Sequence, residues 1–249
     1  MRNALAAILI VAAGPLWADQ VSDLKAGTLN ACRGCDLQDA DFKKADLSGV
    51  DLTGSNLSGA SFHRANLRGA ILEGVTAVGT NFNLAELTQA RLTDGTFTRA
   101  MFYGAQLSGA HLNAADLTEA RMQTVRLTSA TLVGAVLDRT LLRDSVANNV
   151  DFSGASMQET NLNRAQLGRS KFDGATVYFA GFVQAEASRA SFVGTKITYT
   201  DFYGANLRRA TMKDAILSGN RFTTAATRDV DFDLATMTGN FMSNGRLQN

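Results

Sequence analysis

The amino-acid sequence predicts an all-β fold, a four-sided parallel β-solenoid of about eleven coils. Three observations predict it: a strict five-residue period, small residues at a fixed place in each period, and similar residues twenty positions apart. A helix repeats about every 3.6 residues and a strand about every 2, so a period of five fits neither. It fits a chain that turns a corner every five residues and closes one coil with four corners.

The period is carried by a large apolar residue at every fifth position from Leu37 to Leu247, except at Ala77, Ala147, Ala187 and Thr227. Of these 43 centres, 20 are Leu, 12 are Phe and 5 are Met. The residue two places before a centre is small in 41 cases, and 16 of the 22 glycines, counting Gly34 after Cys32, lie two places after a centre. We therefore expect centres and small residues to point inward, and glycine to supply the backbone angles of the corners.

Residues twenty positions apart indicate how the coils stack. One set of centres begins Phe42, Phe62, Phe82, and such sorting of Phe onto one face is not expected of a random five-residue repeat. Successive coils would then lie at the spacing of neighbouring strands, about 4.8 Å. Asn220 and Asn240 break the small-residue rule and are also twenty apart, so they can form a ladder of side-chain amides.

The repeat resembles that of the pentapeptide-repeat family, whose consensus is Ala-(Asp/Asn)-Leu-X-X. Segments 45–49 (Ala-Asp-Leu-Ser-Gly), 65–69 (Ala-Asn-Leu-Arg-Gly) and 205–209 (Ala-Asn-Leu-Arg-Arg) match it, and the resemblance covers about residues 30–249. It implies a right-handed quadrilateral parallel β-helix, in agreement with the phase of the repeat. It says less about function, because function depends on the sites that a fold carries.

Residues 1–18 have the layout of a secretory signal peptide. Arg2 precedes an unbroken apolar run from Ala4 to Ala13, and Gly14–Ala18 then breaks the run and ends on a small residue. Such a run is too short to anchor the chain in a bilayer. We expect cleavage after Ala18 and export of residues 19–249, without a membrane span, to the periplasm or, as a second choice, to the extracellular space.

The first residues of the mature chain are expected to form an N-terminal cap over 19–34, followed by the β-helix over 35–249. A solenoid end exposes core and backbone and therefore needs a cover. Ser22 is placed to N-cap a short helix that Gly27 would stop. Cys32 and Cys35 both face inward by phase and form a candidate disulfide in an exported chain, across a tight loop.

The C-terminal end has no evident cap, because the repeat continues to Leu247. Phe241 takes an outward position beside Met242. The resemblance implies a partner for this end, since some family members dimerise through their C-terminal coils. We expect a homodimer through Phe241, Met242 and Leu247.

A few centres are too small to fill the core. Ala147 is one of them, and the apolar Leu141 and Val146 beside it take outward positions. This combination predicts a distorted coil over 141–149.

Composition argues against catalysis. The chain has only 2 His and 2 Cys, and His63 and His111 fall on different faces. The consensus carboxylates of the first coil also go to different faces, so no acid–base pair converges. We expect no enzyme, no catalytic residue, no cofactor and no metal site.

The balance of basic and acidic residues argues against two kinds of partner, nucleic acid and gyrase. With 24 basic and 23 acidic residues, the chain as a whole is neither a polyanion binder nor an acidic mimic of one. Nucleic acid is therefore not an expected partner. The resemblance also raises a DNA-mimic modulator of gyrase, but that activity needs a strongly acidic surface in the cytoplasm. This chain carries the predicted export signal and is neutral once residues 1–18 are removed.

Two outward-facing columns remain as candidate binding surfaces. The candidate partner patch is apolar and aromatic, and exposed aromatic clusters mark interaction sites. It consists of Tyr178, Phe179, Val183, Tyr199 and Tyr203. Stacking of rings across neighbouring coils would explain the same column without a partner.

The candidate anion patch stacks like charges one coil apart, which costs stability unless an anion relieves the repulsion. It consists of Arg169, Lys171, Arg189, Arg208, Arg209 and Arg228. Packing of arginine stems with hydrated heads is the alternative explanation. The function expected from these observations is an exported, non-enzymatic scaffold for protein–protein interaction, with binding of an anionic cell-envelope ligand as the alternative.

Overall fold

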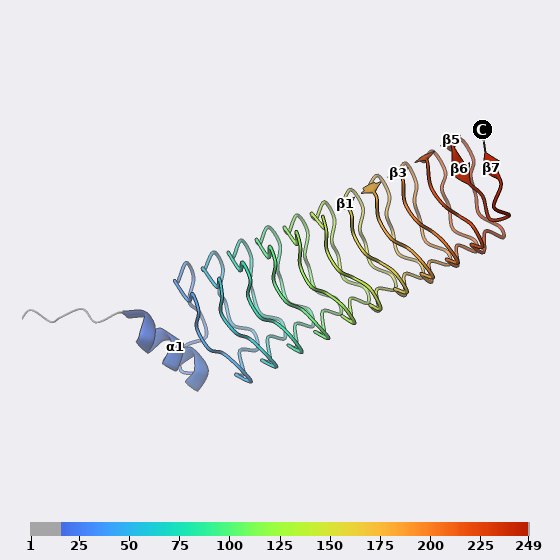
Figure 1. Cartoon of the computed structure of the whole chain (residues 1–249). Coiled ribbons are helices and arrows are strands. Elements are labelled where there is room, and N and C mark those ends of the chain that lie inside the picture. The colour runs from blue at the N-terminus through green and yellow to red at the C-terminus, as the bar shows by residue number, and fades with distance from the viewer. Residues whose placement is uncertain (1–15, 249) are drawn as a thin grey trace, which may run out of the picture.

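The chain forms a long parallel β-solenoid with a helix at its N-terminal end (Figure 1). The structure is a computed structural model that describes residues 16–248. Most of the predicted signal peptide, residues 1–15, lies outside the described residues. Among residues 16–248, no helix is long and apolar enough to cross a membrane.

The coil of twenty residues is confirmed by the backbone pairing. Parallel bridges at five-residue intervals join a residue to the one twenty positions later, from Ala31↔Asp51 to Arg221↔Phe241. The four sides of a coil therefore lie directly above the same four sides of the next coil. The first bridge, at Ala31, lies within the segment assigned to the cap.

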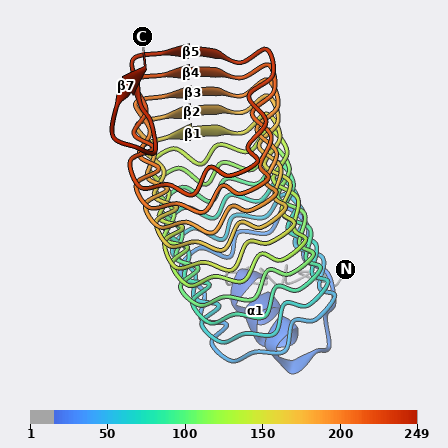
Figure 2. The ribbon, with the colours of Figure 1, turned by 90° about the vertical axis from the view of Figure 1, so that its right-hand side faces the viewer.

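One side of the solenoid becomes regular enough to form named strands. They form a five-stranded parallel sheet in the order β1 to β5, which Figure 2 shows stacked on one face. The elements are α1 (Leu16–Ala26), β1 (Ser156–Gln158), β2 (Thr176–Tyr178), β3 (Lys196–Thr198), β4 (Ile216–Ser218), β5 (Thr236–Thr238), β6 (Asn240–Phe241) and β7 (Leu247–Gln248).

The corners explain the distribution of glycine. Every fifth residue from Gly34 to Gly239 has a positive φ, whether or not it is glycine. An L-residue with a side chain is destabilised by roughly 1–2 kcal/mol in this left-handed region, and glycine avoids that cost. A large side chain at a corner is therefore a departure from the favoured residue.

The core is built as predicted, from stacked centres and small residues. Phe42, Phe62 and Phe82 are fully buried, and their ring centroids lie 5.0 and 5.1 Å apart along the axis. A second stack runs through Phe152, Phe172 and Phe192. Offset or parallel ring stacking at this spacing stabilises each successive coil.

At the N-terminal end, α1 packs on the first coil, as expected of a cap (Figure 1). Leu24 is only 1% exposed, and Gly27 ends the helix with a φ of 69°. The prediction that Ser22 begins the helix is wrong, because α1 already starts at Leu16. The proposed cleavage position after Ala18 thus lies within α1.

At the C-terminal end, the prediction that the repeat continues uncapped to Leu247 is wrong. The chain turns back after Met242, and β7 pairs antiparallel with β6 through Phe241↔Leu247. The three-residue loop 243–245 is closed by hydrogen bonds from the Met242 N–H to the Arg246 carbonyl and from the Gly245 N–H to the Met242 carbonyl, both at 2.8 Å. Gly245 adopts a φ of 75°, which suits the last residue of such a loop. Leu247 is therefore 52% exposed on a hairpin and does not act as a core centre.

The prediction of a distorted coil over 141–149 is also wrong. Leu141 and Val146 keep their parallel bridges to Asn161 and Gln166, and Ala147 is fully buried. The pairing of backbone groups holds the coil in register, so a smaller centre does not interrupt it. Ser170 adds a buried hydrogen bond from its hydroxyl to the Ala147 carbonyl, at 2.6 Å.

Candidate functional site

The two candidate surfaces occupy opposite corners of the same coils. Phe179 follows Arg169 by ten residues, which is half of a twenty-residue coil, and Tyr199 follows Arg189 by the same interval. Since each coil has four corners, the aromatic corner and the arginine corner are diagonally opposed. A partner on one of them does not cover the other.

At the aromatic corner, three of the predicted residues form a contiguous cluster. The rings of Phe179 and Tyr199 stack with centroids 5.2 Å apart, and Tyr178 packs edge-on against both, at 4.5 and 6.0 Å. Phe179 and Tyr199 are each 53% exposed. We call Tyr178, Phe179 and Tyr199 the aromatic cluster.

The other two predicted members of this patch lie around the next corner. Tyr203 is exposed, and the guanidinium carbon of Arg221 lies 4.9 Å from its ring centroid. Arg221 is in turn held by Asp201, whose carboxylate accepts a hydrogen bond from Nε at 2.8 Å. Val183 is half-buried. No ring contact joins Tyr203 to the aromatic cluster within residues 16–248.

Two of the three residues of the aromatic cluster lie on backbone that disfavours bulky side chains. Phe179 and Tyr199 have φ values of 51° and 50°. The next two residues of this corner column are Gly219 and Gly239, and the Tyr199 ring fills the space beside Gly219, where an added Cβ would lie 2.6 Å from the ring. Left-handed backbone is common to every corner of the solenoid, so what distinguishes Phe179 and Tyr199 is the size and exposure of their stacked rings.

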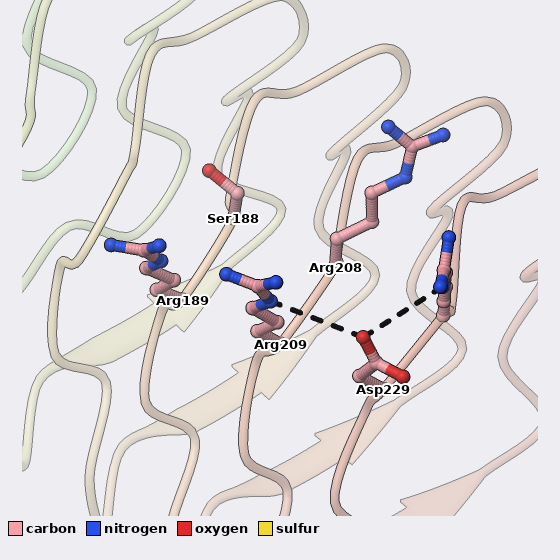
Figure 3. Close-up of a pocket in the computed structure, with 6 residues that line it drawn as sticks. Ser188, Arg189, Arg208, Arg209 and Asp229 are labelled. Atoms are coloured by element: carbon pink, nitrogen blue, oxygen red, sulfur yellow. Dashed lines mark ion pairs between the residues drawn. The ribbon is translucent and has the colours of Figure 1, made fainter.

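At the arginine corner, the side chains border a surface hollow of about 380 Å³. It is lined by Ser188, Arg189, Arg208, Arg209, Arg228 and Asp229 (Figure 3). A second hollow of about 330 Å³ continues from it and shares Ser188 and Arg189. It is lined by Asn148, Asn149, Gly168, Arg169, Ser188 and Arg189. We call the two together the arginine groove.

Five of the six predicted basic residues line this groove, and Lys171 does not. Lys171 is exposed on the next side of the coil, beyond the corner that carries Arg169. The lining residues that the sequence did not single out are Asn148, Asn149, Gly168, Ser188 and Asp229. The sequence signal that could have found Gly168 and Ser188 is that each directly precedes an arginine of the column, so a residue with a short side chain or none lies beside a long one.

The electrostatics of the groove are uneven. Asp229 lies 3.9 Å from Nε of Arg209 and 3.8 Å from Nε of Arg228, as the dashed lines in Figure 3 show. Arg169, Arg189 and Arg208 have no carboxylate within ion-pair distance in the part of the chain that the structure describes. The groove therefore holds three guanidinium groups without a counter-charge of their own.

The opposite corner shows the usual arrangement of charge. There Arg139 lies between Glu119 and Glu159 in the column, and it forms an ion pair with Glu119 at 3.0 Å. Arg164 pairs with Asp144, twenty residues earlier, in the same way at another corner. A column of three arginines departs from this pattern of alternating charge.

Near the N-terminal end, a disulfide links Cys32 and Cys35, with the two Cα atoms 5.6 Å apart. Arg33 lies between them and donates a hydrogen bond to Asp51 at 2.7 Å. The pKa of Asp51 falls from 3.8 to about 2 because of the hydrogen bond from the Thr53 hydroxyl and then that from Arg33, while burial opposes the shift. These contacts tie the first coil to the second.

Within residues 16–248, no group of three or more His, Cys, Asp or Glu side chains is arranged to hold a metal ion. His111 contacts the Thr131 hydroxyl, at 3.3 Å, across neighbouring coils.

Comparison with known proteins identifies the repeat. No curated protein matches the chain. Among solved structures, HetL, a pentapeptide repeat protein involved in heterocyst differentiation regulation in the cyanobacterium Nostoc sp. strain PCC 7120, is 23% identical. The match covers 92% of this chain and 98% of HetL, with a TM-score of 0.50, and supports the fold.

A second solved structure that the chain resembles is full-length QnrB1, a plasmid-mediated fluoroquinolone resistance protein. It is 18% identical, over 83% of this chain and 93% of its own, with a TM-score of 0.34. The family model for pentapeptide repeats matches eight copies. They cover residues 35–74, 80–118, 105–144, 135–174, 178–214 and 188–223. The chain therefore belongs to the pentapeptide repeat family.

Proposed function

We propose that this chain is an exported, non-enzymatic scaffold that binds another protein through the aromatic cluster. The observation that carries the proposal is the stacked pair Phe179 and Tyr199, half exposed on left-handed backbone. A solenoid of stacked coils supplies a rigid support for such a surface. Aromatic side chains are enriched in protein interfaces because they bury a large area at a low cost in conformational entropy.

The first experiment compares capture of periplasmic proteins by residues 19–249 and by the Phe179→Ser/Tyr199→Ser variant. A Tyr103→Ser variant is the matched control, since Tyr103 is 54% exposed but lies several coils away from the cluster. A protein retained by the native chain and by the control, but lost with the double variant, supports the proposal. Equal retention by all three chains contradicts it.

Export rests on the pattern of residues 1–18 and has its own test. The full chain is produced in a Gram-negative host, the cells are fractionated, and the N-terminus of the product is sequenced. A periplasmic product that begins at Asp19 supports export. A cytoplasmic product that retains Met1–Ala18 contradicts it.

A second candidate function is binding of an anionic cell-envelope ligand in the arginine groove. It is favoured by Arg169, Arg189 and Arg208, which border the groove without a carboxylate partner among residues 16–248. Salt separates the two candidates. Binding to exposed arginines weakens as the ionic strength rises, whereas binding to the aromatic cluster changes little.

A DNA-mimic function toward gyrase is disfavoured by charge. Mimicry of DNA requires a dense negative surface, and this chain carries 24 basic and 23 acidic residues. The arginine column would repel the basic surface with which another protein binds DNA.

The scaffold is also proposed to form a homodimer through its C-terminal end. There β5 is the last strand of its sheet, so one edge of its backbone faces away from the other strands. Phe241 and Leu247 are about half exposed on the β6–β7 hairpin, and Met242 is partly buried beside them. Sedimentation of the native chain and of Phe241→Asp tests this: a dimer that the substitution converts to a monomer supports the proposal, and a monomeric native chain rejects it.

A further inference from the structure

We propose that the arginine groove binds a linear acidic polysaccharide, laid along the solenoid axis with one carboxylate at each of Arg169, Arg189 and Arg209. This inference rests on anion binding at the groove, the second of the candidate functions, and names its ligand class. It concerns a surface diagonally opposite the aromatic cluster and does not depend on that cluster.

The need for an external anion follows from the arginine column itself. Arg169, Arg189 and Arg209 occupy one corner of three successive coils, and all three have a φ of 59–60°. The column therefore combines left-handed backbone strain with repulsion between like charges about 4.8 Å apart. Carboxylates placed between the guanidinium groups would remove the repulsion, as Glu119 does for Arg139 at the opposite corner.

The molecule already shows how a carboxylate sits in this column. Asp229 follows Arg209 by one coil and places its carboxylate within 4 Å of both Arg209 and Arg228. It occupies the C-terminal end of the groove, and Asn149 continues the column at the other end. The three arginines between them are the length of column that a ligand would fill.

A linear ligand fits this arrangement better than a small anion. The two hollows share Ser188 and Arg189 and extend over the coils from Asn148 to Asp229. The arginines succeed one another along the axis because their backbones are held in register by parallel bridges. One phosphate ion would contact neighbouring guanidinium groups and leave the rest of the groove empty.

The neutral groups between the arginines favour a sugar polymer over an acidic peptide. Gly168 and Ser188 line the middle of the groove without long side chains, and Figure 3 shows the short Ser188 side chain between the long ones of Arg189 and Arg208. Among residues 16–248, neither the hydroxyl nor the backbone N–H of Ser188 has a hydrogen-bond partner. The N–H of Gly168 is bonded to Asn148, at 2.9 Å, and that of Arg208 to Asn206, at 3.3 Å. The free groups of Ser188 can bond the ring hydroxyls that lie between successive carboxylates.

The test uses residues 19–249 and polygalacturonate, a polymer with one carboxylate per sugar, in a calorimetric titration at low salt. The fully methyl-esterified polymer is the uncharged control. Removal of one charge-assisted hydrogen bond should weaken binding roughly tenfold or more, so Arg189→Gln/Arg209→Gln should reduce affinity by about a hundredfold. Arg99→Gln is the matched control, because Arg99 is an exposed arginine with a φ of 58° at the opposite corner, and it should bind as the native chain does.

Two further measurements distinguish a specific binding site from non-specific electrostatic attraction of a polyanion. Affinity for oligogalacturonates should rise up to the trimer and then level off, because three arginines form the column. Asp229→Asn should bind more tightly than the native chain, because it removes the internal competitor for Arg209 and Arg228.

The outcomes separate anion binding at the groove from the assignment of a polysaccharide as the ligand. If polyphosphate binds at the groove as tightly as polygalacturonate and Arg189→Gln/Arg209→Gln abolishes both, anion binding stands and the polysaccharide assignment fails. If no polyanion binds, or if Arg99→Gln weakens binding as much as the double variant, anion binding at the groove fails as well.

Discussion

Asn220 and Asn240 are joined by a hydrogen bond inside the core: the Asn220 side-chain amide donates to the Asn240 side-chain carbonyl, at 3.0 Å. The same side-chain carbonyl also accepts the backbone N–H of Asn220, at 2.9 Å. The Asn240 amide donates to the Leu217 carbonyl, at 2.9 Å, and both asparagines are fully buried. The amide ladder expected from their spacing is thus confirmed, and it ties together the coils beneath the C-terminal hairpin.

We predict that Asn240→Ala destabilises the C-terminal coils by about 2–3 kcal/mol, because the Asn220 donors and the Leu217 carbonyl lose a buried partner. Hydrogen exchange at the Asn220 amide is the direct measurement, since a solenoid need not unfold in one step. Thr238→Ala, at an exposed position of the same coil, should change little. Native-like protection of the Asn220 amide in Asn240→Ala would show that the ladder adds no stability.

We predict that Arg189→Gly makes the protein more stable, by about 1 kcal/mol, because it relieves left-handed strain and removes a charge from the arginine column. Chemical denaturation at low and at high salt measures both contributions. The gain should be larger at low salt, where repulsion is less screened. Arg99→Gly relieves the same strain beside Glu119, so its gain should be smaller and should not increase at low salt. A loss of stability in Arg189→Gly would show that the arginine stems support the fold.

The fold was predictable because one period controls both the direction and the stacking of each side chain. A residue's place in the five-residue repeat decides whether it points inward, as Phe42 and Phe62 do, and the twenty-residue phase decides its neighbours. Local features that depend on other rules were missed. The turn at Asn244-Gly245 is a hairpin signal that outweighs the repeat, and Ala147 does not distort its coil because backbone pairing holds the register.

The candidate surfaces were predictable only as columns. Phase brought Phe179 next to Tyr199 and Arg189 next to Arg209, since both pairs are twenty residues apart. The twenty-residue phase could not show which side chains make contact with residues on the next side of the coil. Tyr203 instead faces the guanidinium group of Arg221, which belongs to the neighbouring column of Asp201. The groove depends on where long side chains lie beside short ones.

We predict that Cys32→Ser/Cys35→Ser lowers the stability of the first coil by roughly 2 kcal/mol, the value expected for release of a short closed loop. The disulfide lies where α1 meets the solenoid, so the effect should stay at that end. Hydrogen exchange should become faster at the amide of Leu37 and remain unchanged in β2 and β3. Uniform loss of protection along the rod would show instead that the first coil nucleates the whole solenoid.

We predict that acid destabilises the same end through Asp51. Its pKa in the folded protein is about 2, below the ordinary value of 3.8, because the Thr53 hydroxyl and then Arg33 bond its ionised form. A carboxyl group with a lowered pKa contributes stability above the unfolded-state value, and that contribution is lost as the pH falls from about 4 toward 2.

Asp51→Asn should therefore be less stable than the native chain at pH 6, and the difference should shrink as the pH approaches 2. Thermal unfolding at the N-terminal end, followed at several pH values, measures it. Asp41→Asn is the control: Asp41 holds the same place in its repeat, but its carboxylate is exposed and lies 3.8 Å from Lys43, so this variant should follow the native chain. A difference between Asp51→Asn and the native chain that stays constant from pH 6 to pH 2 would mean that packing around Asp51, rather than its charge, joins the first coil to the second.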